Sequence, residues 1–152
     1  MDPVMIAARG FIDDARRVWR AGRSRVLRAV SSPDDRRDLV KALRMMELTP
    51  GNRRPFFVYE APFAEEGPWF DGLCASLRED YEAVREGAAG EGVTLPVWVA
   101  ADDAALGPSG RAAAAVRRVG AMLAGRLDGA VVALVPSQIA APEQWRASMT
   151  GW

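Results

Sequence analysis

Acidic side chains follow two short apolar segments of the chain at the points where those segments end. Glu60 comes directly after the first segment, and Asp102 and Asp103 come directly after the second. Carboxylate oxygens are ligands that Mg²⁺ prefers, so these residues would form a metal site if both segments ended at one sheet edge. Ser109 and Arg111 follow in "GPSGR", where a helix start would favour a phosphate.

A second interpretation of these acids is structural. Acids after a strand often cap helices or face water, and no repeated spacing in this chain enforces the geometry of a metal site. We therefore keep this ligand edge as an alternative, and we predict neither a catalytic residue nor a bound metal.

Within the segment "NRRPFFVYEAPFAEEGPWFDG", residues 52–72, the loop "EAPFAEEGP", residues 60–68, has the length and position of a phosphate-binding loop. A P-loop needs glycines for close backbone approach and a lysine that reaches the phosphates. This loop carries Glu60, Glu65 and Glu66, which would repel phosphate, and the only lysine of the chain is Lys41. The dinucleotide pattern GxGxxG is absent as well. A degenerate P-loop-like or Mg-dependent phosphate- or nucleotide-binding domain is thus the alternative function, and we expect no cofactor.

The sequence contains no histidine and one cysteine. Without an imidazole there is no usual general base, hydrolytic triad or histidine-ligated metal, so we favour a protein that is not an enzyme. Cys74 falls on an apolar helical stripe, where burial raises the pKa of a thiol, and we interpret it as a core residue. A lone cysteine fits a reducing compartment, so we expect a cytoplasmic protein. No segment approaches the ~20 apolar residues that span a bilayer.

Helical periodicity dominates the first 50 residues. Apolar residues recur at helical spacing and predict one long helix or two nearly collinear ones: Val4, Ala8, Phe11, Ile12, Ala15, Trp19, Val26 and Val30. Ser32 as N-cap and Pro33 in the first turn predict the start of a second helix, and "TPGN" predicts its end.

Three short runs of strand formers alternate with helices in the rest of the chain. The predicted strands are Phe56–Tyr59, Val97–Ala101 and Ala130–Val135. Helices are predicted from Pro68, over Ala112–Leu127 and from Pro142. The order ααβαβαβα predicts an α/β fold with a three-stranded parallel sheet in an αβα sandwich and an N-terminal pair of helices.

The length of 152 residues predicts a single domain over 1–152, with a helical part over 1–50 and strand–helix repeats over 55–152. So small a sheet would leave two edges to protect. The chain therefore also fits the N-terminal domain of a longer protein, or a protein that pairs with itself.

Charge is divided unevenly along the chain. Residues 1–54 hold 13 of the 20 basic and 7 of the 20 acidic residues, whereas the remainder holds 7 and 13. On the first predicted helix, arginines line up beside the apolar seam: Arg9, Arg16, Arg20 and Arg23. This pattern predicts a face that docks onto an acidic surface of a protein partner or a second copy. Trp152, at the chain end, is a second predicted docking contact.

A noncatalytic interaction or regulatory adaptor domain within a larger complex or multidomain protein is therefore the leading hypothesis. The arginine seam also allows packing on the domain's own core, with the arginines solvated or paired with its acidic half. Nucleic acid or an anionic membrane would suit the arginines as well, but the acidic remainder of the chain argues against both.

Overall fold

The computed structural model describes residues 8–20, 32–100 and 103–152, which divide between two compact units, residues 1–52 and 53–152. The described residues of the first unit form two helices, α2 (Arg9–Arg20) and α3 (Pro33–Glu47). Those of the second unit form two strands and three helices: β1 (Phe56–Tyr59), α4 (Glu66–Gly90), α5 (Pro108–Leu123), β2 (Val131–Leu134) and α6 (Pro142–Met149). No helix in the described ranges is both long enough and apolar enough to cross a membrane.

Helix α3 begins where the sequence predicts. The Ser32 hydroxyl accepts a hydrogen bond from the amide of Asp35 at 3.2 Å, and Pro33 occupies the first turn, where its missing N–H costs nothing. The helix ends at Glu47, and Gly51 follows with a φ of 81°, a left-handed conformation that suits glycine. Of the long N-terminal helix, α2 confirms the central part, and Val4, Val26 and Val30 lie outside the described residues.

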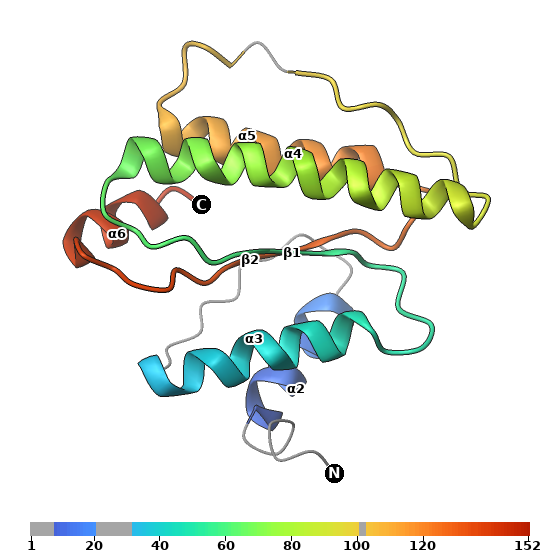
Figure 1. Ribbon diagram of the computed structural model, residues 1–152, viewed down its shortest axis with the longest axis horizontal. Helices are drawn as coiled ribbons and strands as arrows, with labels where there is room; N and C mark the ends of the chain where they lie inside the picture. The colour runs from blue at the N-terminus through green and yellow to red at the C-terminus, as the bar shows by residue number, and fades with distance from the viewer. Residues whose placement is uncertain (1–7, 21–31, 101–102) are drawn as a thin grey trace. The chain divides into compact units, whose positions relative to one another are not determined.

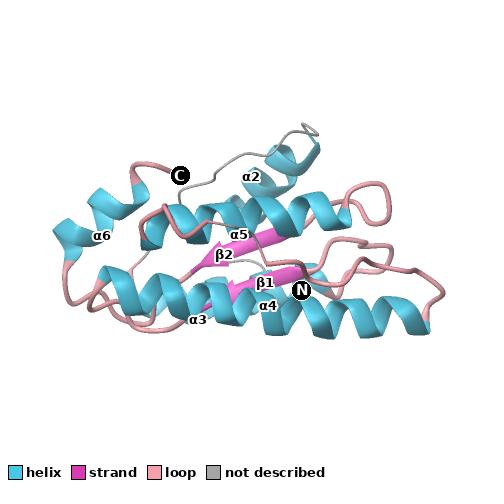
Figure 2. Cartoon of the chain, turned by 90° about the horizontal axis from the view of Figure 1, so that it is seen from above, coloured by secondary structure: helices cyan, strands magenta, loops and turns pink. Residues whose placement is uncertain are grey.

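Strands β1 and β2 pair in parallel, in the register Phe56↔Val131 to Tyr59↔Leu134. Helices α4 and α5 connect them and pack against each other over one face of the pair (Figure 1; Figure 2). Parallel strands need such a helical crossover because a short turn cannot return the chain to the same direction. The predicted parallel pairing of the first and third segments is therefore confirmed.

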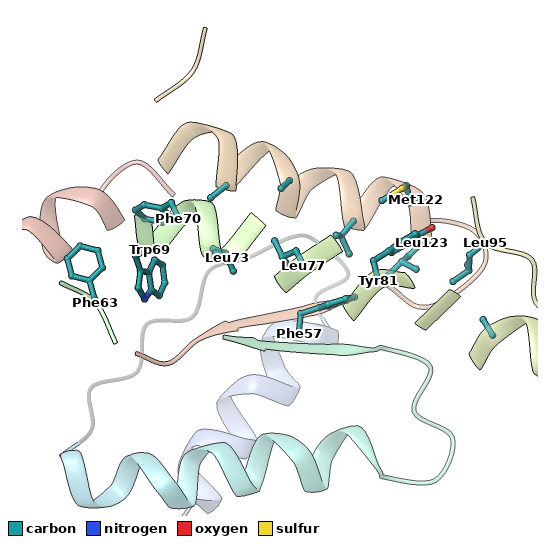
Figure 3. Packing of buried hydrophobic residues seen from close by; sticks show 14 residues of the cluster. Phe57, Phe63, Trp69, Phe70, Leu73, Leu77, Tyr81, Leu95, Met122 and Leu123 are labelled. Carbon is teal, nitrogen blue, oxygen red and sulfur yellow. The ribbon is translucent and has the colours of Figure 1, made fainter. Parts of the chain in front are cut away.

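The core of the second unit lies between the strands and the two long helices (Figure 3). Helix α4 contributes Leu73, Leu77 and Tyr81, each at most 1% exposed and spaced at one turn of a helix. Phe57 reaches this layer from β1, and Leu123 reaches it from α5. The predicted apolar face of α4 is confirmed, and its spacing explains why one side of a 25-residue helix is buried.

The second predicted strand is wrong. Residues 97–100 form neither strand nor helix, and Ala101 lies outside the described residues. The segment that follows α4 runs on the far side of these helices from the sheet (Figure 1), where the described residues form no strand with which it could pair. Within the described ranges the sheet has two strands, so the general α/β class is confirmed and the three-stranded αβα sandwich is not.

Candidate functional site

The two strands end at one edge, and the loops that follow them run side by side. The Ser137 amide donates to the Glu60 carbonyl at 3.0 Å, and the Phe63 amide donates to the Gln138 carbonyl at 2.7 Å. Further along, the amide of Ala140 donates to the Phe63 carbonyl at 2.8 Å. The loops that follow β1 and β2 are therefore neighbours, and backbone hydrogen bonds already join them.

Aromatic side chains fill the space beside these loops (Figure 3). Trp69, at the start of α4, is 3% exposed, and four rings meet it edge-on at centroid distances of 4.9 to 5.7 Å. These rings belong to Tyr59, Phe63, Phe70 and Trp145. Edge-to-face contacts of this kind add roughly 0.5 to 1.5 kcal/mol per pair to the burial of apolar area. The edge where an open α/β sheet usually holds a ligand is thus occupied by the protein's own side chains.

Two hydrogen bonds fix the orientation of the cluster. The indole N–H of Trp69 donates to the carbonyl of Ala61 at 2.8 Å, and the Tyr59 hydroxyl donates to the carbonyl of Trp69 at 3.2 Å. Gly72 lies directly against that hydroxyl, and a Cβ at this position would overlap it. Glycine is needed at position 72 because the Tyr59 side chain approaches its Cα closely, and not because of the backbone dihedral angles there.

Arg111, one of the residues expected to bind phosphate, is engaged within the second unit. One guanidinium nitrogen lies 3.0 Å from a carboxylate oxygen of Asp71 on α4, and the other donates to the carbonyl of Leu106 at 2.8 Å. Both contacts tie the start of α5 to its surroundings. Their removal would be needed before Arg111 could turn towards a ligand.

Ser109 and Trp152 are also held inside the unit. The Ser109 hydroxyl donates to the carbonyl of Ser148 at 3.3 Å and accepts from the indole N–H of Trp152 at 3.1 Å. The Trp152 ring stacks on Phe70 with 5.9 Å between centroids and 21° between planes. These contacts give Trp152 a packing role at the end of the chain, and its docking role stays a prediction.

The carboxylates of the expected ligand edge do not gather into a metal site in the described part of the chain. No group of three histidine, cysteine or acidic residues suited to a metal occurs there. Glu60 and Asp103 are both half-buried, and Asp102 lies outside the described residues. The carbonyl of Asp103 accepts a turn hydrogen bond from the amide of Leu106 at 2.9 Å.

Cys74 is half-buried against the core, as its place on the apolar stripe predicts. Burial raises the pKa of its thiol, and the negative charges of Asp71 and Asp103 raise it further, whereas Arg111 and Arg118 oppose them. A raised pKa lowers the fraction of nucleophilic thiolate at neutral pH. The environment therefore suits a packing residue and disfavours a nucleophile.

Helix α2 presents a different surface. Ile12 and Ala15 are each 2% exposed, which confirms the seam of the predicted amphipathic helix. Arg9, Arg16 and Arg20 lie on its exposed side, and Arg23 is outside the described residues. Unlike Ser109 and Arg111, these three arginine side chains are exposed in the part of the chain that the structure describes.

The ion pairs on α2 are local and loose. Arg16 lies 4.0 Å from Asp13 and Arg17 lies 3.3 Å from Asp14, each three residues apart on the same exposed surface. Exposed pairs of this type contribute roughly 0 to 1 kcal/mol and weaken with salt. The side chains of Asp13, Arg16, Arg17 and Arg20 line an open hollow. This surface of α2 is therefore charged and accessible.

Sequence reasoning did not identify the aromatic cluster as the group that occupies the strand ends. The available signal was five tryptophans in 152 residues, with Trp69 and Trp145 following the first and the third predicted strand.

No family model matches this chain, and neither a curated protein nor a solved structure shows significant similarity to it.

Proposed function

We propose that this protein is a noncatalytic interaction domain that docks onto an acidic surface of a partner protein through α2. The observation that carries the proposal is the exposed row of Arg9, Arg16 and Arg20 beside a buried seam. Because the buried seam determines which side of α2 faces solvent, the three arginines lie together on the exposed side. We place this function in the cytoplasm, within a larger complex or multidomain protein, because the single cysteine fits a reducing setting.

Arginine is the residue type that suits such a surface. Its planar guanidinium binds a carboxylate through two parallel hydrogen bonds and stacks on aromatic rings, and arginine is enriched at protein interfaces. The acids Asp13 and Asp14 balance part of the charge, but α2 keeps four arginines against two aspartates. A partner that presents an acidic helix or strand face would replace these loose pairs with bidentate contacts.

The α2 arginines and the polar side chains at the start of α5 also differ in how much they contribute to holding the fold together. Arg111 and Ser109 hold secondary-structure elements together through contacts of 2.8 to 3.3 Å. On α2, Arg16 and Arg17 pair with the exposed aspartates Asp13 and Asp14 of the same helix. We infer that exposed pairs of this kind contribute little to folding and leave the surface able to serve a partner.

The test is fluorescence anisotropy with a labelled acidic amphipathic helical peptide, at low and at high salt. The wild-type chain should bind it, and the affinity should fall as salt rises because exposed charges are screened. Arg16→Glu/Arg20→Glu should reduce binding about tenfold or more at low salt. A double-stranded DNA probe of equal charge separates a protein surface from a nucleic-acid surface, and tighter binding to DNA would overturn the proposal.

A matched control is available in the second unit. Arg117 on α5 and Arg146 on α6 are exposed. Arg117→Glu/Arg146→Glu changes the net charge by the same amount but leaves α2 intact. If this control loses as much affinity as the α2 variant, binding depends on net charge, and α2 is not the docking face.

A further inference from the structure

The segment that follows α4 carries strand-forming residues that have no strand partner. Trp98 is flanked by Val97 and Val99, which are 64% and 67% exposed. Within the described residues, neither the N–H nor the C=O groups of Val97–Ala100 take part in a backbone hydrogen bond. Valine and tryptophan favour strands, so local preference and local structure disagree here.

Trp98 anchors this segment to the helices beneath it. Its ring meets Tyr81 of α4 at 5.7 Å, edge-to-face, and the guanidinium of Arg118 on α5 lies 5.8 Å from the ring centroid. The hydroxyl of Tyr81 donates to the carbonyl of Pro96 at 2.6 Å. The segment is therefore held in place at one point, while the two valines beside that point face solvent.

We propose that Val97–Val99 pairs in antiparallel fashion with the same segment of a second copy of this chain. A helix-anchored segment with unpaired backbone groups can accept a strand by main-chain hydrogen bonding, as exposed sheet edges do. This surface is separate from α2 and does not depend on the docking function proposed above.

A second copy is the occupant that the residues favour. "VWV" reads the same in both directions, so antiparallel pairing about Trp98 places Val97 opposite Val99 of the partner subunit. Residues 92–101 carry no charged side chain, so pairing of the two segments places no like charges of their own opposite each other. A twofold axis at Trp98 buries the same patch on both copies, as an isologous dimer requires. Paired β-branched residues across strands add roughly 0.2 to 1 kcal/mol each.

Sedimentation equilibrium of the full chain over a wide range of concentration tests the proposal. The wild-type chain should show a reversible monomer–dimer equilibrium. Val97→Lys/Val99→Lys places like charges opposite each other and should raise the dimer dissociation constant about tenfold or more. Val99→Pro, which keeps an apolar residue but removes one N–H, should also weaken the dimer.

Leu48→Lys is the control, because Leu48 is 81% exposed and lies in the first unit. It should leave the dimer unchanged, as should Arg16→Glu/Arg20→Glu. A wild-type chain that stays monomeric at all concentrations overturns the inference. A dimer that survives Val97→Lys/Val99→Lys, or that is lost equally in the control, also overturns it.

The register has its own test, in a Cys74→Ser background. A disulfide should form in an equal mixture of Val97→Cys and Val99→Cys chains, because these positions face each other. Neither variant alone should form one, because its two cysteines would be diagonal neighbours, roughly 7 to 8 Å apart and beyond disulfide reach. Efficient cross-linking of a single variant would contradict this pairing.

Discussion

The strand-end edge of the second unit and the exposed side of α2 carry the same kinds of polar side chains and use them differently. At the edge, Arg111 and Ser109 are joined to two other helices, α4 and α6, and to Leu106 and Trp152. On α2, Arg16 and Arg17 pair with the aspartates one turn away. Residue type alone therefore does not identify a functional site. The contacts of each side chain show whether it holds the fold together or is available to bind a partner.

The largest expected loss of stability follows a substitution in the aromatic cluster at the strand-end edge. Trp69→Ala removes a nearly buried indole and its hydrogen bond to Ala61, so the free energy of unfolding should fall by about 3 to 5 kcal/mol. Urea denaturation followed by circular dichroism measures this loss. Arg117→Ala on the exposed side of α5 serves as the control and should cost well under 1 kcal/mol. Equal losses in both variants would mean that the aromatic cluster is not what stabilises the edge.

Gly72→Ala should have the next largest effect, because the new methyl group would overlap the hydroxyl of Tyr59. We expect a loss of about 1 to 3 kcal/mol in the free energy of unfolding, typical of overpacking. Tyr59→Phe removes the hydroxyl, so Gly72→Ala should cost much less in that background. A double-mutant cycle in urea measures the coupling, and purely additive losses would show that the close approach is not the cause.

Arg111→Lys should have a smaller effect. Lysine keeps the charge but cannot contact Asp71 and Leu106 at once through a planar fork. Because Asp71 is 62% exposed at its side chain, the ion pair is screened, and we expect a loss of only about 1 kcal/mol. Thermal unfolding in low and high salt measures it. A loss of several kcal/mol would place Arg111 in a more buried network than its contacts indicate.

The smallest expected effect is a loss of stability at alkaline pH. Burial raises the pKa of Cys74, whose ordinary value is 9.0, and those of Tyr59 and Tyr81, whose ordinary value is 10.0. Below about pH 8 these groups stay largely protonated in both the folded and the unfolded chain. As pH rises further, the unfolded chain ionises first, so the free energy of unfolding should decrease.

Urea titrations at pH 8 and above measure this decrease, and Cys74→Ser should make it shallower near pH 9. If the pH dependence of unfolding is the same in Cys74→Ser as in the wild-type chain, the thiol is not shifted by folding.

Local sequence signals predict the helices and the parallel strand pair well. Ser32 and Pro33 mark the start of α3, and the spacing of Leu73, Leu77 and Tyr81 marks the buried side of α4. Both signals act within one or two helical turns, so a sequence contains all that is needed to read them.

The fate of Val97–Ala100 could not be predicted in this way. Its residues favour a strand as strongly as Val131–Leu134 do, but a strand also needs a neighbour in register. Only β2 has one, because α4 and α5 return the chain to β1 at that point. The contacts of Arg111, Ser109 and Trp152 within the unit could not be predicted either, because they join residues about 40 positions apart.

The stability of Arg16→Glu/Arg20→Glu, measured by urea denaturation beside Ser109→Ala/Arg111→Ala, tests most directly whether the α2 arginines are available for a partner. We expect the α2 variant to lie within about 0.5 kcal/mol of the wild-type chain, as changes at exposed positions usually do. The edge variant should lose about 1 to 3 kcal/mol, because it removes hydrogen bonds between elements. If instead the α2 variant loses more stability than the edge variant, the arginines hold the fold together and the docking face lies elsewhere.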